Sequence, residues 1–481
     1  MQRLSRNKNK MEEQIRTRLP QEFTERMRES LGSEADAFFA SYDSPRAYGL
    51  RRNPLKMEKE LFETQMPFAL EKVSWAAEGY YYEETERPGR HPFHEMGLYY
   101  IQEPSAMCVV EVADPKPGEY VLDLCAAPGG KSTQIAGRMA GEGLLVCNEI
   151  VPNRAKILSQ NIERLGIRNA VVLNHAPQEL EARFTAFFDR IVVDAPCSGE
   201  GMFHKEEAAL TEWSPENVVM CADRQKEILA SAVKMLRPGG VLVYSTCTFA
   251  PAEDEEMVAW LLAEYPDLEL VPIDTKALGI SEGDLPGTGR IWPHRQRGEG
   301  HFVARLKKRG TLLPRQNTGF AAAMSVQEAA GGRGKGKKGK KERTGEGRGN
   351  AWSSYEDFAA QNLNTVWSGR RLQFGDQLYL IPEEMPDLKG LVVVRPGLHL
   401  GTNKKNRFEP SHALALALQS SEVKQLYETE EPEKYLRGET LACDPSLKGW
   451  TLVTCQGQPM GWGKADRGVM KNHYPKGLRI W

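Results

Sequence analysis

Two cysteines stand in polar loops directly after apolar runs, where a purely structural role is unusual. Cys197 lies in the segment DAPCSGEGMF (194–203), and Cys247 lies in YSTCTF after the apolar run GGVLV. A buried cysteine usually serves as a small hydrophobe, but Cys197 follows Asp194 and a proline, and Cys247 follows a serine and a threonine. Such residues could bind a metal, form a redox disulfide or act as nucleophiles.

A metal site or a redox pair explains less of this pattern than a nucleophile does. Zinc is disfavoured because neither cysteine belongs to a C-x-x-C motif or stands near a pair of histidines. A redox disulfide would leave Asp194 without a role. The eight cysteines are scattered over 481 residues, so nothing indicates a disulfide framework or an oxidising compartment. We therefore expect no metal.

A glycine loop upstream predicts a cofactor that contains a nucleoside. In VLDLCAAPGGKST, Gly129 and Gly130 stand between an apolar strand and a helix, where the backbone can approach a ligand closely. The spacing fits neither the dinucleotide fingerprint nor a P-loop, because Cys125 stands where the P-loop glycine should be. Glu149, 19 residues beyond Gly130, is placed to bind ribose hydroxyls. NAD and S-adenosylmethionine both fit this pattern.

Methylation of a pyrimidine ring carbon uses all of these features. Carbon 5 of cytosine is a weak nucleophile, and a thiolate that adds to carbon 6 pushes electron density onto it. The thiolate needs local positive charge such as that of Lys131, and Asp194 could hydrogen-bond the ring nitrogen or the amino group. Enzymes that methylate exocyclic amines need an aromatic side chain after the proline, but here the segment is Asp-Ala-Pro-Cys. The residues alone leave open which cysteine attacks.

Strands and helices alternate regularly around these loops. From about residue 117, β-runs such as YVLDLC, GLLVCNEI and FDRIVVDA alternate with helical segments such as VPNRAKILSQNIERLG. This alternation predicts βαβ units and a mostly parallel sheet, with strands at 268–272 and 300–306 closing it. In such sheets ligands bind beyond the carboxyl ends of the strands. The glycine loop and the two cysteine loops should therefore meet there.

Composition divides the chain into four parts. The net charge is −2, and no apolar run approaches the ~18 residues of a membrane span. The N-terminus lacks the apolar segment of a secretory signal, so we expect a cytoplasmic protein without a membrane partner. Residues 331–350 hold eight glycines, eight Lys or Arg residues and only two acids, which predicts a disordered basic linker. It could serve as a solubilising tether or contact RNA phosphates. The predicted parts are an N-terminal RNA-binding region (1–95), a catalytic domain (96–308), the flexible linker (309–350) and a C-terminal region (351–481).

Two segments outside the predicted sheet carry basic residues that we expect to contact RNA phosphates. The first is the stretch around Arg51, Arg52 and Lys56. The second is the end of the chain, which has β-alternation and contains three tryptophans and several basic residues: Trp450, Trp462, Trp481, Lys464, Lys471, Lys476 and Arg479. Stacking and phosphate contacts on a small β module suit RNA binding, whereas each tryptophan taken alone fits a core position better.

Four motifs, in this order, resemble the Nol1/Nop2/Sun family of RNA cytosine-5 methyltransferases: LDLCAAPGGKST, NEIVPNRAKILSQNIERLG, VVDAPCSGEGMF and YSTCTFAPAEDE. The flanking segments LPQEFTERM, IWPHRQRGEGHFVARL and MGWGKADRGVMKNHYPKGLRI are similar to a bacterial branch that acts on 16S ribosomal RNA. The resemblance implies a Rossmann-like α/β methyltransferase core that uses S-adenosylmethionine, a small N-terminal α+β region and a C-terminal β-rich module like the PUA family. The implied partner is 16S ribosomal RNA within the 30S subunit, and a monomer is the default expectation.

The resemblance also implies roles for individual residues. Cys247 becomes the nucleophile and Cys197 the residue that resolves the covalent adduct, although thymidylate-type chemistry, in which the cysteine follows a proline, would favour Cys197. Asp194 and Lys131 would line the target base. Where the family often has an acid that contacts adenine, this chain has Asn174. The residues implied to bind S-adenosylmethionine are Cys125, Ala126, Ala127, Pro128, Gly129, Gly130, Lys131, Glu149, Arg154 and Asp194.

Three other functions fit parts of the pattern. A non-catalytic ribosome-assembly factor on a degenerate methyltransferase fold should have lost at least one member of the set, and all are present. A nicotinamide enzyme with a redox cysteine pair is disfavoured because the G-x-G-x-x-G spacing is missing. The same methylation on another RNA, such as tRNA, stays open as an alternative.

Overall fold

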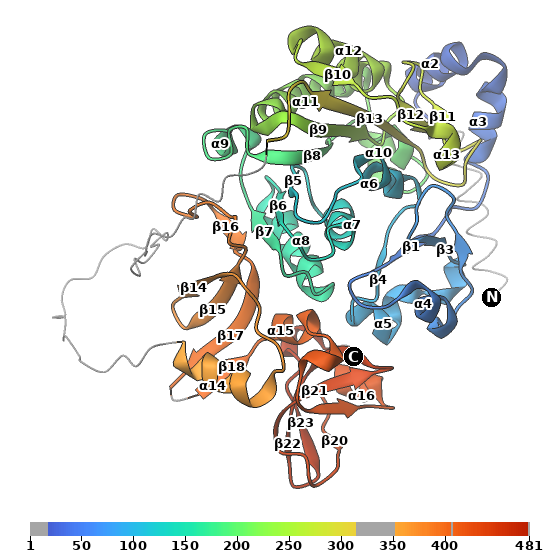
Figure 1. Ribbon diagram of the computed structural model, residues 1–481. Helices are drawn as coiled ribbons and strands as arrows, with labels where there is room; N and C mark the ends of the chain where they lie inside the picture. The colour runs from blue at the N-terminus through green and yellow to red at the C-terminus, as the bar shows by residue number, and fades with distance from the viewer. Residues whose placement is uncertain (1–17, 314–351, 406, 480–481) are drawn as a thin grey trace, which may run out of the picture.

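A ten-stranded sheet forms the centre of the fold, with the N-terminal region to its right and two smaller C-terminal sheets below it in Figure 1. The computed structural model describes residues 18–313, 352–405 and 407–479. Most of the predicted linker, and Trp481, lie outside the described residues. The motifs identified above all fall on the central sheet and its loops.

Five parallel strands form the middle of the central sheet: β5 (Tyr120–Asp123), β6 (Leu144–Asn148), β7 (Ala170–Leu173), β8 (Phe188–Asp194) and β9 (Leu236–Thr246). The spatial order is β11-β12-β13-β9-β8-β5-β6-β7-β16, with β10 paired to β13. The outer strands pair antiparallel: β10 (Leu268–Leu270), β11 (Ser281–Glu282), β12 (Gly289–Ile291), β13 (His301–Lys308) and β16 (Val393–Arg395). The prediction of a mostly parallel α/β sheet is confirmed.

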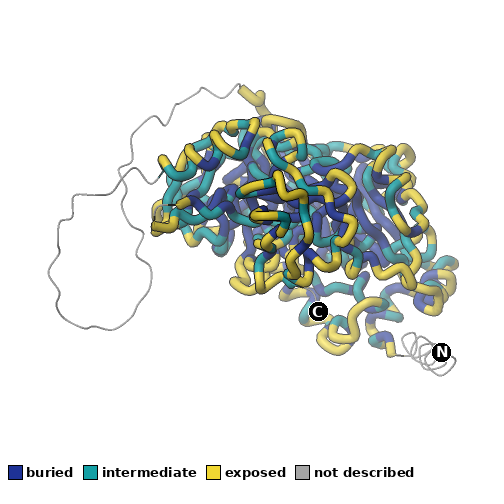
Figure 2. The backbone as a smooth tube through the Cα atoms, turned by 90° about the horizontal axis from the view of Figure 1, so that it is seen from below, coloured by how far each residue is buried: buried dark blue, intermediate teal, exposed yellow. Residues whose placement is uncertain are grey.

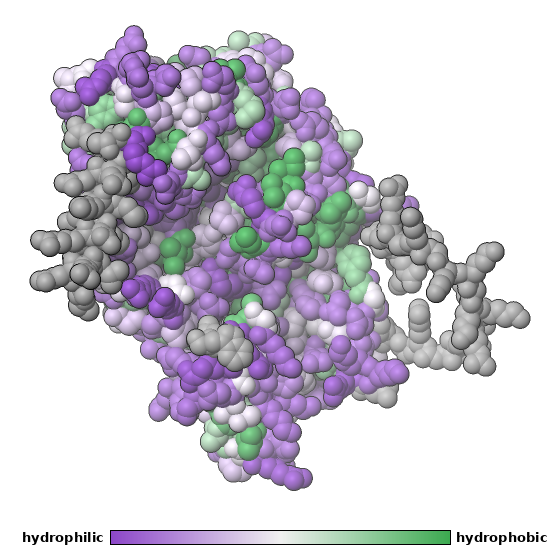
Figure 3. Space-filling view, turned by 180° about the vertical axis from the view of Figure 1, so that it is seen from behind, coloured by the Kyte–Doolittle hydropathy of each residue, from purple (hydrophilic) through white to green (hydrophobic). Residues whose placement is uncertain are grey.

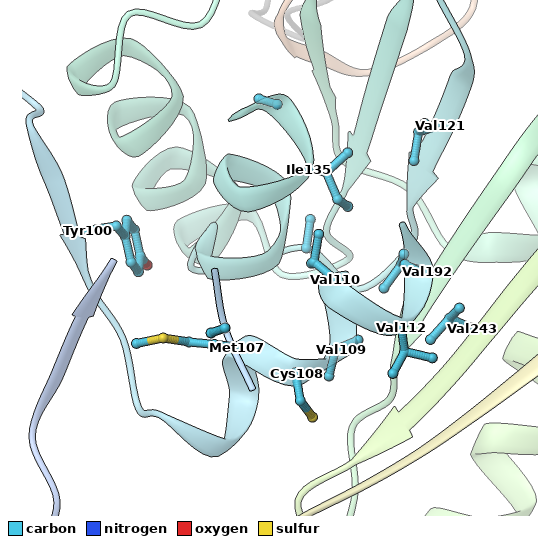
Figure 4. Packing of buried hydrophobic residues seen from close by; sticks show 14 of the residues in the cluster. Tyr100, Met107, Cys108, Val109, Val110, Val112, Val121, Ile135, Val192 and Val243 are labelled. Atoms are coloured by element: carbon cyan, nitrogen blue, oxygen red, sulfur yellow. The ribbon is translucent and has the colours of Figure 1, made fainter. Parts of the chain in front are cut away.

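Helices cover both faces of this sheet. On one face lie α6 (Cys108–Ala113), α7 (Gly130–Arg138) and α8 (Pro152–Arg164), and on the other lie α9 (Pro177–Leu180), α11 (Pro215–Met235) and α12 (Glu255–Glu264). The short α10 (Glu207–Glu212) and α13 (Thr275–Leu278) belong to connecting segments. Successive strand residues point to opposite faces, so Val121 and Val192 pack with α6 and α7 (Figure 4), whereas Leu122 and Ile191 pack on the α11 side.

The N-terminal region combines helices with a four-stranded antiparallel sheet of order β2-β3-β1-β4. Its elements are α2 (Gln21–Leu31), α3 (Ala35–Ser41), β1 (Gly49–Arg52), α4 (Lys59–Gln65), β2 (Glu71–Lys72), β3 (Gly79–Tyr81), α5 (Pro92–Glu95) and β4 (Tyr99–Ile101). Phe23 of α2 packs edge-on against Phe203, and Phe38 of α3 packs against Phe249. Because these partners follow the two cysteine loops, the N-terminal helices hold those loops from outside.

The C-terminal residues form two further sheets, with orders β14-β15-β17-β18 and β19-β21-β22-β23-β20. The first set comprises α14 (Ser353–Asn362), β14 (Arg370–Phe374), β15 (Gln377–Ile381), β17 (Leu398–Lys404), β18 (Arg407–Pro410) and α15 (His412–Ala417). The second comprises β19 (Leu426–Glu428), α16 (Pro432–Leu436), β20 (Leu441–Ala442), β21 (Gly449–Cys455), β22 (Gln458–Asp466) and β23 (Val469–Asn472). Trp462 is buried in the core between the two sheets. This agrees with the prediction that a tryptophan of this segment, taken alone, fits a core position.

The central sheet also takes in β16, a strand from beyond the linker. Val393 pairs with Leu173 of β7, and the Arg395 guanidinium lies 2.9 Å from Glu163 of α8. At three residues, this strand is too short for an alternating pattern to predict it. The predicted C-terminal region (351–481) therefore completes the edge of the central sheet.

The prediction that Arg51, Arg52 and Lys56 contact RNA phosphates is wrong. Their exposed fractions are only 2%, 5% and 6%. The Arg52 guanidinium pairs with Glu78 at 2.5 Å, and the Lys56 ammonium donates to the Leu416 carbonyl of α15. A buried charge must find partners inside the protein, and this segment finds them in neighbouring parts of the fold.

Burial is concentrated in the strands of the interior, and the exposed residues lie at the periphery (Figure 2). The face seen in Figure 3 is mostly hydrophilic, with apolar side chains in small scattered patches. Over the described ranges, the helices are too short or too polar to cross a membrane.

Candidate active site

The three loops that carry the motifs meet at one edge of the central sheet. Strand β5 has β6 on one side and β8 on the other, so the order of connection reverses beside it. Ligands of such sheets bind at this reversal, beyond the carboxyl ends of the strands. The parallel register pairs Asp194 at the end of β8 with Ser245 near the end of β9. The loops with Cys197 and Cys247 therefore leave the sheet side by side.

The two cysteines face each other in this site. Their sulfur atoms lie 3.2 Å apart. The residues that follow them are also joined, because the hydroxyl oxygens of Ser198 and Thr248 are 2.9 Å apart. One pair of contacts thus fixes the relative position of the two loops.

A buried carboxylate holds this pair of loops from behind. Glu253 accepts hydrogen bonds from the backbone N–H of Ser198 at 3.0 Å and from its hydroxyl at 2.5 Å. The Gln225 amide donates to Glu253 at 2.8 Å and to the Pro196 carbonyl at 3.0 Å. Burial raises the pKa of Glu253 to about 7, against these hydrogen bonds, which act to lower it. The sequence reasoning missed Glu253, although it stands in the motif YSTCTFAPAEDE.

Lys131 and Asp194 form an ion pair beside the cysteines. The Lys131 ammonium lies 2.5 Å from one carboxylate oxygen of Asp194, and the other oxygen accepts from the Ser245 hydroxyl at 2.8 Å. His301 of β13 lies 3.3 Å from that second oxygen. Burial acts to raise the pKa of Asp194, but Lys131 and His301 hold it well below its usual range. Asp194 is therefore an ionised hydrogen-bond acceptor.

The surroundings shift the pKa values of Cys197 and Lys131. The hydrogen bond with Cys247, together with burial, raises the pKa of the Cys197 thiol well above its usual value. Burial acts to lower the pKa of Lys131, but the Asp194 carboxylate raises it, and Lys131 also interacts electrostatically with Cys247. Near neutral pH, Cys197 thus keeps its proton and Lys131 its charge.

The glycine loop approaches the carboxyl end of β5 with its backbone. Gly129 has φ +116°, a backbone conformation that residues other than glycine rarely adopt, and it is the N-cap of α7. The Ala126 N–H donates to the Asn148 carbonyl at 2.9 Å, which ties the loop to the end of β6. Cys125 is half-buried, Ala127 is buried and Pro128 is exposed. Free N–H groups at the start of α7 therefore face the same edge as the cysteines.

Glu149 follows β6 and is 3% exposed. Its carboxylate accepts from the Val151 N–H at 2.9 Å and lies 3.6 Å from the Arg154 guanidinium. Arg154 also donates to the Ala127 carbonyl at 2.9 Å, so it links Glu149 to the glycine loop. The Asn174 amide donates to the Glu149 carbonyl at 2.6 Å. Arg154 and Asn174 thus hold the backbone around Glu149.

A buried residue from the N-terminal sheet supports the glycine loop. Arg51 donates to the Gly130 carbonyl at 2.9 Å and to the Thr133 hydroxyl at 2.7 Å, and it also contacts the Gln102 amide oxygen. Burial lowers the pKa of Arg51 to about 10. The sequence indicated no such role, because Arg51 and Gly130 are distant in the chain.

These residues fit a nucleoside cofactor with a charged tail. Asp123, at the end of β5, is fully buried, and its Oδ1 has no hydrogen-bond partner among the described residues. Burial raises the pKa of Asp123 to about 7, and the Ser132 hydroxyl donates to its other oxygen. An unfilled acceptor beside a glycine cradle and an acidic residue suits a ligand that carries hydroxyl and ammonium donors.

Sheet order, glycine loop and paired cysteine loops together define a Rossmann-like methyltransferase. A methyltransferase homolog protein from Pyrococcus horikoshii is 31% identical, with a TM-score of 0.51, over 58% of this chain and 91% of that chain. The structure of NSun6 from Pyrococcus horikoshii is 22% identical with a TM-score of 0.53, over 61% of this chain and 99% of that chain, and supports the fold alone.

Four family models match successive parts of the chain: "N-terminal domain of 16S rRNA methyltransferase RsmF" at 19–104, "16S rRNA methyltransferase RsmB/F" at 110–307, "RsmF rRNA methyltransferase first C-terminal domain" at 357–418 and "Methyltransferase RsmF PUA domain" at 427–480. Ribosomal RNA small subunit methyltransferase F of Enterobacter sp. (strain 638) is 33% identical over 478 residues, or 95% of each chain. That of Salmonella agona (strain SL483) is also 33% identical, over 95% of this chain and 96% of the relative. The chain belongs to the RsmF family of 16S rRNA methyltransferases.

Proposed function

We propose that this protein methylates carbon 5 of a cytosine in 16S ribosomal RNA through a covalent bond between the RNA and Cys247. The observation that carries the proposal is the 3.2 Å contact between the Cys197 and Cys247 sulfurs, beside the ion pair of Lys131 and Asp194. A methyltransferase that acts on an exocyclic amine has no use for two facing thiols. One that acts on a ring carbon needs a nucleophile and a group that helps it leave again.

Cys247 is the nucleophile in this proposal. The Cys197 thiol, whose pKa is raised, donates its proton to the Cys247 sulfur as a hydrogen bond, and the Lys131 charge stabilises the same thiolate. Addition of this thiolate to carbon 6 of cytosine makes carbon 5 nucleophilic. After carbon 5 has gained its methyl group, a base removes the carbon-5 proton and the bond between sulfur and carbon 6 breaks. Cys197 then stabilises the departing thiolate, which accounts for its role in resolving the adduct.

Asp194 orients the target base. Because its pKa is held below the usual range, it accepts a hydrogen bond from the cytosine amino group rather than donating one to the ring nitrogen. The Lys131 ammonium, held against the same carboxylate, is placed to counter the charge that builds on the ring as the thiolate adds. The Ser245 hydroxyl keeps the carboxylate in this orientation.

S-adenosylmethionine supplies an electrophilic methyl group when it is bound. The residues that would hold it are those of the glycine loop, Cys125 to Lys131, together with Glu149 for ribose hydroxyls, supported by Arg154, and with Asp194 at the edge of the site. Arg51 fixes the loop by its bonds to Gly130 and Thr133. A protein that modifies ribosomal RNA acts where ribosomes assemble, which is the cytoplasm.

The C-terminal module offers a surface for the RNA. On β22 and β23, Lys464 and Lys471 stand directly opposite each other, and both are exposed. Like charges in that position destabilise a sheet, so the two lysines serve a purpose other than stability of the module. The Lys464 ammonium lies 5.5 Å from the ring centre of the half-buried Trp450. Phosphate contacts and stacking here would offset the few kcal/mol that are needed to unstack a target base.

The test is to trap the covalent intermediate. Cys197→Ala and Cys247→Ala variants are incubated with S-adenosylmethionine and either 16S RNA or 30S subunits, and run on a denaturing gel. We expect Cys197→Ala to accumulate a denaturant-stable adduct, because the thiolate cannot leave, and Cys247→Ala to form none. Cys221→Ala is the control, because this buried cysteine lies on α11 and outside the pair. Mass spectrometry of the RNA from wild-type reactions identifies the methylated base and counts the sites.

Each other outcome changes the proposal in a defined way. A reversed adduct pattern would exchange the roles of the cysteines. Methylation of tRNA but not of 16S RNA would change the substrate and keep the chemistry. If the wild type transfers no methyl group to any RNA yet still binds 30S subunits, the protein is an assembly factor rather than an enzyme.

A further inference from the structure

A cavity of about 290 Å³ opens where the N-terminal region meets the loop that connects β12 to β13. Its wall comprises the end of α3 with residues 41–47, His204 from the segment after Cys197, and residues 293–299. Ligand pockets start at roughly 300 Å³, so this volume suits one small group rather than a helix. None of these residues takes part in the proposed reaction.

A buried carboxylate in the cavity wall, that of Glu299, can accept a further hydrogen bond. The Glu299 side chain is only 5% exposed; the Arg46 guanidinium lies 3.5 Å from it and the His204 ring lies 3.4 Å from it. The contact with Arg46 is an ion pair without a hydrogen bond, because the Arg46 Nε is buried and has no hydrogen-bond partner in the described part of the chain. The Glu299 N–H donates to Glu103 at 3.0 Å, which fixes the backbone. Glu299 is thus positioned to accept from a ligand N–H group.

Arg46 differs from the other two arginines in the wall. Arg295 is held by both oxygens of Glu34, and Arg297 pairs with Glu71 while its guanidinium lies over the Tyr81 ring. Arg46 has the long contact with Glu299 and lies 5.5 Å from the ring centre of Tyr48, and its side chain is 30% exposed. It can therefore turn to an anionic ligand without breaking a hydrogen bond at its Nε. An acceptor next to an available guanidinium matches the two kinds of group in a nucleotide, a base edge and a phosphate.

Backbone contacts connect the segments that line the cavity to the loops that carry Cys197 and Cys247. The Gly201 N–H donates to the Cys247 carbonyl at 2.8 Å. A side-chain carbon at Gly201 would lie 2.9 Å from that carbonyl oxygen and 3.1 Å from the carbonyl oxygen of Gly300, which follows Glu299. His301, the next residue, contacts Asp194. A group bound in the cavity would therefore be a close neighbour of a base bound at Cys247.

We propose that this cavity binds a nucleotide adjacent to the target cytosine, with its base donating an N–H hydrogen bond to Glu299 and its phosphate contacting Arg46. This inference rests on the proposed function, since it needs an RNA substrate at Cys247. It adds a specificity determinant: the enzyme reads an unpaired neighbour of the target as well as the target itself. A single-stranded or distorted RNA segment meets this requirement, because the neighbouring base must be free to leave its stack.

The experiment compares Glu299→Gln, Arg46→Met and the control Arg309→Met, whose arginine is exposed directly after the end of β13. Methyl transfer is measured with 16S RNA transcripts in which each nucleotide within two positions of the mapped methylated cytosine is replaced in turn. We expect both cavity variants to raise KM for RNA about tenfold, with kcat and the Kd for S-adenosylmethionine within twofold of wild type. Replacement of one neighbour should impair the wild type but add little to Glu299→Gln.

An unchanged KM in both cavity variants, or the same response to every neighbour replacement in Glu299→Gln as in wild type, would refute the subsite while leaving the covalent chemistry intact. Thermal unfolding shows whether Glu299→Gln is folded. If it is not, Arg46→Met still tests the subsite. Failure of the wild type to methylate either the transcripts or 30S subunits assembled from them would instead refute the proposed function, and the adduct gel detects that failure separately.

Discussion

The segment around β1 and the β22–β23 face of the C-terminal module are both basic, but they use their charges in opposite ways. Arg51 and Lys56 point inward and donate to carbonyl groups of distant segments. Lys464 and Lys471 point outward, opposite each other on neighbouring strands. A buried cation is tied to internal acceptors, because an unpaired one costs several kcal/mol. The exposed pair has only weak partners, such as Asp466 at 3.9 Å from Lys471, and can exchange them for an anion.

The largest effect is expected at Arg51. Arg51→Met removes the hydrogen bonds that Arg51 donates to the Gly130 carbonyl, the Thr133 hydroxyl and the Gln102 amide oxygen, which should lower the free energy of unfolding by roughly 3 kcal/mol. The Kd for S-adenosylmethionine should rise as the loop loosens. Chemical denaturation and calorimetric titration measure these changes, with Arg309→Met as the control. A stable variant that has lost only RNA affinity would restore the view of Arg51 as a phosphate contact.

Substitution of Lys56 should raise the free energy of unfolding, whereas substitution of Arg51 should lower it. Burial lowers its pKa to about 7 from a usual value of 10.5, so the folded protein binds fewer protons than the unfolded chain between those pH values. Stability from this group therefore rises with pH across that window, and the buried ammonium costs stability at pH 7.

Lys56→Met removes that cost, and we expect the variant to be more stable at pH 7 by roughly 2 kcal/mol. The advantage should shrink between pH 7 and pH 10. Denaturation curves at several pH values measure it, and the exposed Lys276→Met is the matched control. A variant that is less stable at every pH would show that the bond to the Leu416 carbonyl outweighs the cost of burial.

The smallest effect on stability is expected at the exposed pair. Lys464→Ala with Lys471→Ala should change the free energy of unfolding by less than about 0.5 kcal/mol. The slope of log affinity for 16S RNA against log salt should fall by about 2, because each phosphate contact contributes roughly 0.9. Filter binding over a salt series, with Lys276→Ala as the control, decides this. An unchanged slope would place the RNA elsewhere on the molecule.

Much of the fold could be predicted because its signals are local. The alternation of apolar runs and helices between β5 and β9 predicts a mostly parallel sheet, and such sheets place their ligands at the carboxyl edge. The contact between Cys197 and Cys247 follows from that rule and from the parallel register of β8 and β9. The cytosine chemistry and the roles of the site residues stay proposals that the adduct experiment tests.

The sequence by itself determined which side chains stand at the ends of the strands, since each motif sits within a few residues of its strand. The tertiary structure alone decided which way charged side chains point, and what they meet. Glu253, the cavity at Glu299 and the edge strand β16 all depend on segments that are distant in the chain. The physical reason is that burial of a charge is settled by the acceptors that other segments bring to it, and no local pattern records those.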